Sequence, residues 1–232
     1  QQAAKTDADV IVMCGVHFMA ETAKILCPHK IVVEPAPEAG CSLADSCDPV
    51  AFRAFIEEHP GHTVISYVNT TADVKALSDI VVTSGNARKI IDSLPADQPI
   101  IFGPDRNLGG YISSVTGREM LLWQGACHVH DRFSLQGILD MKKAHPGAKV
   151  LVQIIADMVG STARLLDYAR KSDADTFIVV TESGILHQMQ KDCPEKRFLA
   201  APAEDAECQC NECEYMKMIT LPKLYTALRD LQ

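Results

Sequence analysis

The stretch Glu38-Ala39-Gly40-Cys41-Ser42 sets an interval that the rest of the sequence follows. Cys127, in Gln124-Gly125-Ala126-Cys127-His128, lies 86 residues further along the chain. Cys213, in Asn211-Glu212-Cys213-Glu214, lies another 86 residues beyond it. Three cysteines at one repeated interval indicate that a single structural unit recurs along the chain.

Other motifs recur at matching intervals. His59-Pro60-Gly61 returns 86 residues later as His145-Pro146-Gly147. An offset of 166 residues places Asp7-Ala8-Asp9 on Asp173-Ala174-Asp175, each followed by an apolar run. The sequence therefore predicts tandem copies of one α/β unit, each with a cysteine at the junction to the next.

The repeat predicts four segments. Residues 1–40 are expected to be the remainder of a truncated first unit, 41–126 the second unit, 127–213 the third, and 214–232 a C-terminal helix. Leucines at 3-4-3 spacing in that last helix are typical of a face packed against a core. They are Leu221, Leu224, Leu228 and Leu231.

Strand and helix patterns alternate at short spacing through all the units. The apolar runs 31–33, 63–68 and 176–180 predict buried strands, and amphipathic stretches between such runs predict helices. The polar sequence 104–107 is expected to form a turn after a strand at 99–102. This alternation predicts an α/β fold with parallel sheets and helices on both faces.

Composition and charge narrow the classes of function. The 232 residues are 47% hydrophobic, which suffices for two or three small cores. A net charge of −8 gives no reason to expect nucleic acid as a partner. No apolar run reaches the roughly 18 residues needed to span a bilayer, so we expect no membrane partner and a cytoplasmic location. Nine cysteines in such a chain favour metal or redox chemistry over a disulfide framework.

Small and polar residues follow the predicted strands. In open parallel sheets, ligands bind outside the carboxyl ends of the strands, where helix N-termini present N–H groups. Singly, such residues are more often caps or turn formers, but their recurrence in every unit favours a binding site. They are Gly15, His17, Tyr67, Asn69, Thr83, Ser84, Asp105, Asn107, Cys127, His130, Gly160, Ser161, Thr162, Thr181 and Glu182.

Three thiolates, one from each unit, can converge on an axis that relates the units. Cysteine thiolates are the usual ligands of iron–sulfur clusters, which normally have four. With three, one iron of a cubane cluster keeps an open position and can act as a Lewis acid. The repeat therefore predicts a 4Fe–4S cluster on Cys41, Cys127 and Cys213.

Two other interpretations stay open. Cys208, Cys210 and Cys213 could instead hold zinc, or Cys210 and Cys213 could form a disulfide, but no second Cys or His pair completes a zinc site. The protein could then be a non-catalytic metal or redox sensor. An aconitase-like iron–sulfur hydro-lyase, which acts on a hydroxy acid, is the alternative enzyme.

Long motifs of the chain resemble the quinolinate synthase family of NAD biosynthesis. The matching runs are CGVHFMAETAK at 14–24, EAGCSLAD at 38–45, VNT at 68–70, PDRNLG at 104–109, WQGACHVH at 123–130, GST at 160–162 and TESGI at 181–185. The resemblance covers essentially the whole chain. It implies three homologous three-layer αβα domains around a pseudo-threefold axis, the first of them truncated here.

The resemblance also implies a reaction. Enzymes of this family condense iminoaspartate with dihydroxyacetone phosphate to quinolinate, with loss of phosphate and two waters, and depend on a 4Fe–4S cluster. Such a protein is a transferase with small-molecule substrates. A contact with the aspartate-oxidising enzyme that supplies iminoaspartate is left open.

Motif by motif, the resemblance implies roles for single residues. Cys41, Cys127 and Cys213 correspond to the cluster ligands, and Tyr67 and His130 to catalytic residues that also contact substrate.

Four further residues are implied to bind substrate. Asn69 corresponds to a residue that orients it, and Ser84, Ser161 and Thr162 to donors that grip phosphate or carboxylate.

The sequence departs from the family pattern in two places. A His-Tyr pair and a serine of the first domain would lie before Gln1. A His-Pro-Glu stretch is missing after Val152, where the repeat interval falls from 86 to 78 residues. These residues belong to the acid–base machinery that the resemblance implies, and a molecule that lacked them would be expected to bind a cluster but to be inactive. We expect instead that the protein has them, in a substrate-gating loop that is mobile by necessity.

Overall fold

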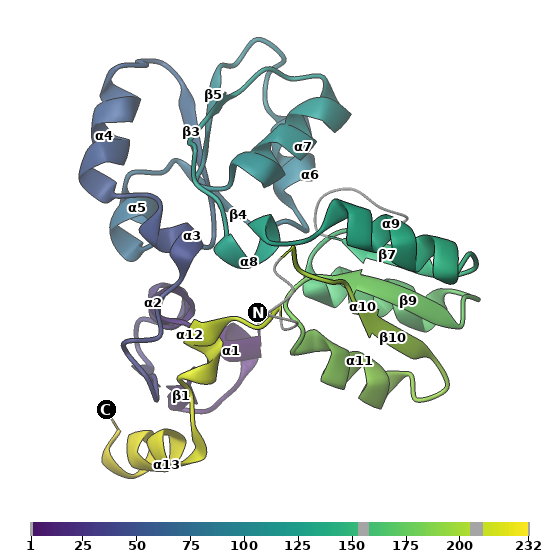
Figure 1. Ribbon diagram of the computed structural model, residues 1–232. Helices are drawn as coiled ribbons and strands as arrows, with labels where there is room; N and C mark the ends of the chain where they lie inside the picture. Colours follow the sequence, from purple (N-terminus) through teal and green to yellow (C-terminus); the bar gives the residue numbers. More distant parts are fainter. Residues whose placement is uncertain (1, 153–157, 205–210, 232) are drawn as a thin grey trace.

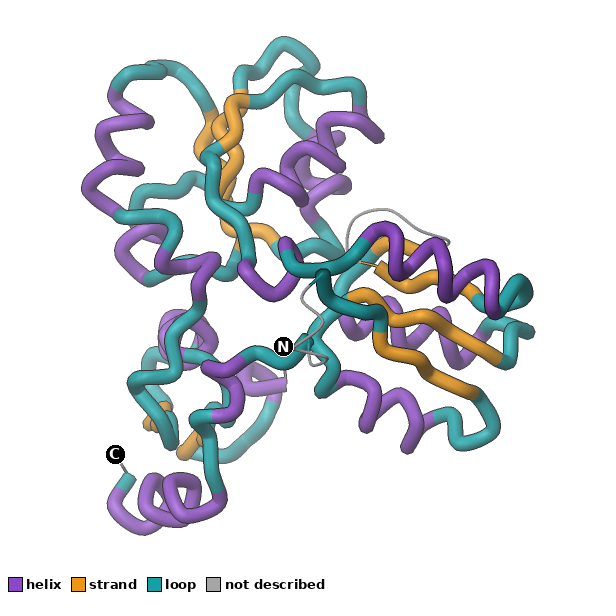
Figure 2. Tube along the Cα trace, viewed as in Figure 1, coloured by secondary structure: helices purple, strands orange, loops and turns teal. Residues whose placement is uncertain are grey.

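The strands of the protein form three separate parallel sheets in the described part of the chain, which is residues 2–152, 158–204 and 211–231 of a computed structural model (Figure 1). The first sheet pairs β1 (Val10–Val12) with β2 (Ile31–Val33). The second has the order β4-β3-β5-β6, and the third has the order β8-β7-β9-β10. Figure 2 shows the strands in three groups. The predicted α/β fold with small parallel sheets is confirmed.

The second and third sheets share one topology. The second contains β3 (Thr63–Tyr67), β4 (Ile80–Val82), β5 (Ile100–Gly103) and β6 (Leu121–Leu122). The third contains β7 (Lys149–Val152), β8 (Met158–Val159), β9 (Thr176–Val180) and β10 (Arg197–Ala200). In each, the first strand pairs with both the second and the third, and the fourth extends the sheet beyond the third. The offset of 166 residues places the start of β1 on that of β9, and the start of β2 on that of β10.

Helices cover both faces of the second sheet (Figure 1). They are α4 (Pro49–Glu57), α5 (Ala72–Ala76), α6 (Ala87–Ser93) and α7 (Arg106–Thr116). On one face Phe52 and Val74 pack against Ile101, and on the other Ile91 and Ile112 belong to a second core. Each of these side chains is fully buried, and such burial stabilises a fold by about 1.5–3 kcal/mol per side chain.

The third sheet is built in the same way, with α9 (Leu135–Ala144), α10 (Thr162–Lys171) and α11 (Ile185–Asp192). Alternate residues of β9 enter different cores, because neighbouring side chains of a strand point to opposite faces. Phe177 packs with Leu165 and Met189, whereas Ile178 packs with Ala148 on the other face.

Polar caps define where many helices begin. Asp48 caps the start of α4 and Thr71 that of α5, and each accepts a hydrogen bond from a backbone N–H three residues on. The remaining helices are α2 (His17–Leu26), α13 (Leu221–Asp230) and the four-residue helices α1 (Gln2–Lys5), α3 (Ser42–Asp45), α8 (His128–Asp131) and α12 (Glu214–Lys217). Among the residues described, no helix is both long and apolar enough to cross a bilayer.

Two expectations were wrong. The sequence 104–107 is not merely a turn, because Asp105 caps α7, whose glycines and serines concealed its helical pattern. The leucine stripe of α13 is not a core face. Leu221 is 81% exposed, and Leu228 and Leu231 are 53% and 45% exposed, because no other element covers that face in the described part of the protein.

Candidate active site

Each of the three evenly spaced cysteines stands immediately before a four-residue helix. Cys41 is the N-cap residue of α3, Cys127 that of α8 and Cys213 that of α12, all with extended backbone. The three helices lie near the place where the three sheets and their helices come together (Figure 1). The sequence repeat is therefore a repeat of local structure at the cysteine.

The three thiols lie close enough to affect one another. Burial raises the pKa of the Cys41 thiol to about 11, and the Cys127 and Cys213 thiols add to the rise. Burial also raises the pKa of Cys213, to which Cys127 contributes. Chain segments 86 residues apart thus bring their sulfur atoms to one region.

Backbone N–H groups face two of these sulfur atoms. The N–H groups of Leu43 and Ala44 lower the pKa of Cys41 against the effect of burial, and those of Tyr215 and Met216 do the same for Cys213. In both cases the donors are two and three residues after the cysteine. A helix N-terminus stabilises a thiolate in this way, which suits a sulfur that binds metal.

Tyr67, the last residue of β3, lies beside the thiols. Burial raises the pKa of its phenol to about 12, Asp105 adds to the rise, and a hydrogen bond with Ser84 opposes it. Weaker contributions come from Cys41 and Cys127. Tyr67 is therefore a neutral hydrogen-bond donor at physiological pH, and two predicted substrate contacts, Tyr67 and Ser84, touch each other.

Residues from all three units line one cavity of about 390 Å³. Tyr67 enters it from the end of β3, Asn69 from the loop that follows, and Thr162 from the start of α10. Phe18 and Thr22 of α2 line it from the first unit. The structure thus brings together three of the residues predicted to bind substrate.

Ser84 and Ser161 follow equivalent strands, β4 and β8. Ser161 caps α10, since its Oγ accepts a hydrogen bond from the Arg164 N–H at 3.4 Å. The same Oγ lies 3.8 Å from the point where a Cβ of Gly85 would stand. The loops that carry the two predicted anion-binding serines are therefore neighbours.

His130 lies on α8, three residues after Cys127. Its Nε2 is 3.5 Å from Thr181 Oγ1 at the end of β9, and its ring stacks on Phe133 with centroids 6.4 Å apart. Burial lowers the pKa of the imidazole, which Asp105 and Asp131 partly offset. His130 is a neutral imidazole near the junction of the second and third units.

Asp105 was one of the polar residues expected at the strand ends but was given no specific role, and Lys75 was not predicted at all. Asp105 is 6% exposed and accepts hydrogen bonds from the N–H groups of Asn107 and Leu108, and it acts electrostatically on both Tyr67 and His130. The signal in the sequence was an aspartate directly between a strand and the helix it caps.

Lys75 gave no such signal, because a lysine on a short helix is usually solvated. Its Nζ donates a hydrogen bond to the Thr70 carbonyl and lies 5.6 Å above the Phe18 ring. Burial lowers the pKa of this ammonium to about 8, while Glu21 opposes the change. Glu21 also accepts a hydrogen bond from the Ala72 N–H at 2.9 Å. Lys75 and Glu21 together hold the loop that carries Asn69 against the first unit.

Comparison with known proteins identifies the family. The family model described as "Quinolinate synthetase A protein" matches residues 1–232. The chain belongs to the quinolinate synthase family.

Relatives named quinolinate synthase extend that match over nearly the whole chain. The protein of Microcystis aeruginosa is 57% identical over 99% of this chain and 74% of its own length. That of Thermosynechococcus vestitus is 56% identical, covering 99% and 75%. The Chloroherpeton thalassium protein is 53% identical, covering 99% and 74%.

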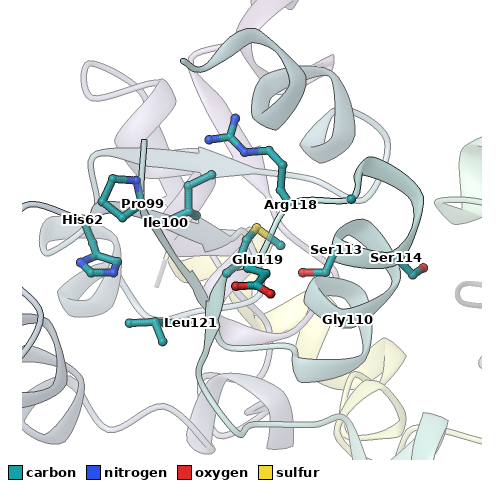
Figure 3. A pocket seen from close by; sticks show the side chains of 11 residues that line it. His62, Pro99, Ile100, Gly110, Ser113, Ser114, Arg118, Glu119 and Leu121 are labelled. Atoms are coloured by element: carbon teal, nitrogen blue, oxygen red, sulfur yellow. The ribbon is translucent and has the colours of Figure 1, made fainter. Parts of the chain in front are cut away.

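A larger cavity, of about 860 Å³, lies at the other end of the second sheet (Figure 3). His62, Arg118 and Glu119 are among its lining residues, but the Arg118 guanidinium donates hydrogen bonds to four backbone carbonyls. The Arg118 charge is thus neutralised in part by the protein's own carbonyl oxygens. None of the predicted site residues lines this cavity.

Several predictions fall on residues that the structure does not describe. Cys208 and Cys210 lie in 205–210, so the alternative zinc site and the Cys210–Cys213 disulfide fall outside the described residues. The missing His-Pro-Glu stretch maps to the edge of 153–157, which is also outside them.

Proposed function

We propose that the protein is a quinolinate synthase that condenses iminoaspartate with dihydroxyacetone phosphate and releases phosphate and two waters. The observation that carries this proposal is the convergence of Cys41, Cys127 and Cys213, which stand at the unit junctions 86 residues apart, beside Tyr67. The names of the relatives support the reaction. We infer further that the three units surround a pseudo-threefold axis passing near the three thiols.

The donor set fits a 4Fe–4S cluster better than a single metal ion. Within the described residues, no group of three His, Cys, Asp or Glu side chains is arranged to hold one ion. A cluster binds each cysteine to a different iron, so its ligands need not meet at one atom. Cys41, Cys127 and Cys213 would hold it, and the N–H groups facing Cys41 and Cys213 would stabilise their thiolates. When bound by three cysteines, the cluster supplies one open iron as a Lewis acid.

The residues predicted to bind substrate suit anionic ligands. The protein carries a net charge of −8, so its overall field repels a phosphate or a dicarboxylate. Local neutral donors offset that repulsion: the hydroxyl groups of Ser84, Ser161 and Thr162, and the side-chain amide of Asn69. The 390 Å³ cavity has room for two small substrates side by side.

We assign proton transfer and hydrogen-bond donation to His130 and Tyr67. Because burial lowers its pKa, His130 is neutral near pH 7 and one ring nitrogen can accept a proton. Tyr67 stays protonated up to high pH, so its hydroxyl donates to a developing oxyanion while Ser84 holds its orientation. Asp105 stabilises the imidazolium that forms when His130 takes up a proton.

Metal and sulfide analysis of anaerobically purified protein tests the proposal first. We expect about four irons and four sulfides per chain, together with turnover of iminoaspartate and dihydroxyacetone phosphate. One zinc per chain without sulfide would contradict it. Turnover of a hydroxy acid in place of those two substrates would identify an aconitase-like hydro-lyase instead.

A further inference from the structure

The residue after each of the three cysteines begins a helix, and these residues meet. Ser42, His128 and Glu214 are the first residues of α3, α8 and α12. They occupy equivalent places in the repeat, 86 residues apart. Their side chains differ in chemistry, so the contacts among them are not imposed by the repeat.

Ser42 and His128 form a close pair between the second and third units. The Ser42 Oγ is 2.5 Å from His128 Nδ1, and the same Oγ is 3.3 Å from the His128 backbone nitrogen. The backbone N–H donates to the hydroxyl oxygen. Toward Nδ1 the same hydroxyl can donate or accept, depending on which ring nitrogen carries the hydrogen, so Ser42 is bonded to His128 in either tautomer.

The C-terminal segment completes the contact. The Tyr215 ring meets the His128 ring edge-on, with centroids 6.2 Å apart and an angle of 74° between the planes. The same Tyr215 packs against a small core that Val16 of the first unit and Ala44 of the second unit share. Glu214 Oε1 is 4.0 Å from His128 Nε2, but this carboxylate is 72% exposed and contributes little.

We propose that Ser42, His128 and Tyr215 form an interunit bracket that fixes the separation of the three cysteines, with His128 as a positioning residue. A four-residue helix is far too short to be stable alone. Each of α3, α8 and α12 must therefore contact other elements if its capping cysteine is to keep a fixed direction. The bracket supplies such contacts between all three. Its consequence for metal retention rests on the proposed function.

The first experiment measures how fast a chelator removes iron from the cluster-loaded full chain. Ser42→Ala and His128→Ala each remove the same hydrogen bond, so we expect about tenfold faster loss from either. The double variant should lose iron no faster than the single ones, because the bond is already absent. His128→Asn, whose amide can still face Ser42, should stay within about twofold of the unchanged protein.

A matched control separates the bracket from general damage. His59 is also half-buried, and its Nδ1 lies 2.7 Å from the Phe55 carbonyl oxygen, at the far end of α4. His59→Ala should reduce thermal stability without changing the rate of iron loss. Equal iron loss from His128→Ala and the unchanged protein would overturn the proposal, as would additive effects of Ser42→Ala and His128→Ala.

A second experiment does not depend on iron. Dibromobimane links two neighbouring thiols, and peptide mapping identifies the pair. In metal-free protein we expect Cys41–Cys127 linking to fall severalfold in His128→Ala and to persist in His128→Asn. Unchanged linking in His128→Ala would overturn the bracket. If the unchanged protein binds no iron but its linking depends on His128, the proposed function fails and the bracket stands.

Discussion

The second and third units have the same sheet topology but differ between their first two strands. Residues 68–79 connect β3 to β4 and include α5, whereas only 153–157 connect β7 to β8. The longer connection carries Asn69 into the cavity, and Lys75 and Glu21 hold it against α2. The cysteine-capped helices, by contrast, are alike in all three units. The repeated parts thus supply the proposed metal ligands, and the parts that diverged supply the specific contacts.

We expect the largest effect from a change in the repeated cysteine-capped helices. Cys213→Ser should abolish the cluster, because two remaining cysteines hold it too weakly. Cys208→Ser and Cys14→Ser, the latter at an exposed thiol, should leave about four irons per chain. Iron and sulfide analysis decides, and a cluster that survives in Cys213→Ser but not in Cys208→Ser would contradict our choice of third ligand.

The hydrophobic cores of the second and third units should lose similar stability when a buried side chain is removed. Phe52→Ala in the second unit and Leu165→Ala in the third each empty a fully buried position, so we expect losses of about 3–5 and 2–5 kcal/mol in the free energy of unfolding. Leu221→Ala, at an 81% exposed position, should stay within about 0.5 kcal/mol. Denaturant titration measures all three. A large loss at Leu221 would mean that a partner or second copy covers α13.

Tyr67→Phe should affect chemistry and leave the metal in place. The substitution removes only the hydroxyl that Ser84 orients, and loss of one such donor typically costs about a hundredfold in kcat. Iron content should be unchanged. Steady-state kinetics measures the effect, and unaltered kcat would remove Tyr67 from the catalytic residues.

The smallest effect concerns the divergent connection. Burial lowers the pKa of Lys75 from 10.5 to about 8, so between these pH values the unfolded chain binds more protons than the folded one. The contribution of Lys75 to stability therefore rises with pH across that window.

Lys75→Met should lack that rise, whereas Lys143→Met, at a 75% exposed lysine of the third unit, should keep it. Thermal unfolding of the three proteins from pH 7 to 11 measures the difference. Parallel pH profiles for the unchanged protein and Lys75→Met would show that Lys75 is solvated.

Local sequence predicted much of the fold. The predicted strands 31–33 and 176–180 match the structure residue for residue, and 63–68 extends only one residue beyond β3, since short β-branched runs between turn residues have few alternatives. The helix α7 was not predicted, because Gly109, Gly110 and its serines have weak helical propensity. In the folded protein, the burial of Leu108 and Ile112 outweighs that weak propensity. The exposed stripe of α13 shows the converse, an amphipathic pattern that lacks a described partner.

The sequence by itself determined the repeat, the parallel α/β class and the three evenly spaced cysteines, because these depend on order along the chain and on local hydrophobicity. Only the tertiary structure decided which side chains meet: Tyr67 with Ser84, Asp105 with His130, Lys75 with Thr70, and Ser42 with His128. Such contacts join residues from different elements and, for Ser42 and His128, from different units. Their geometry depends on how sheets and helices pack, which no local pattern encodes.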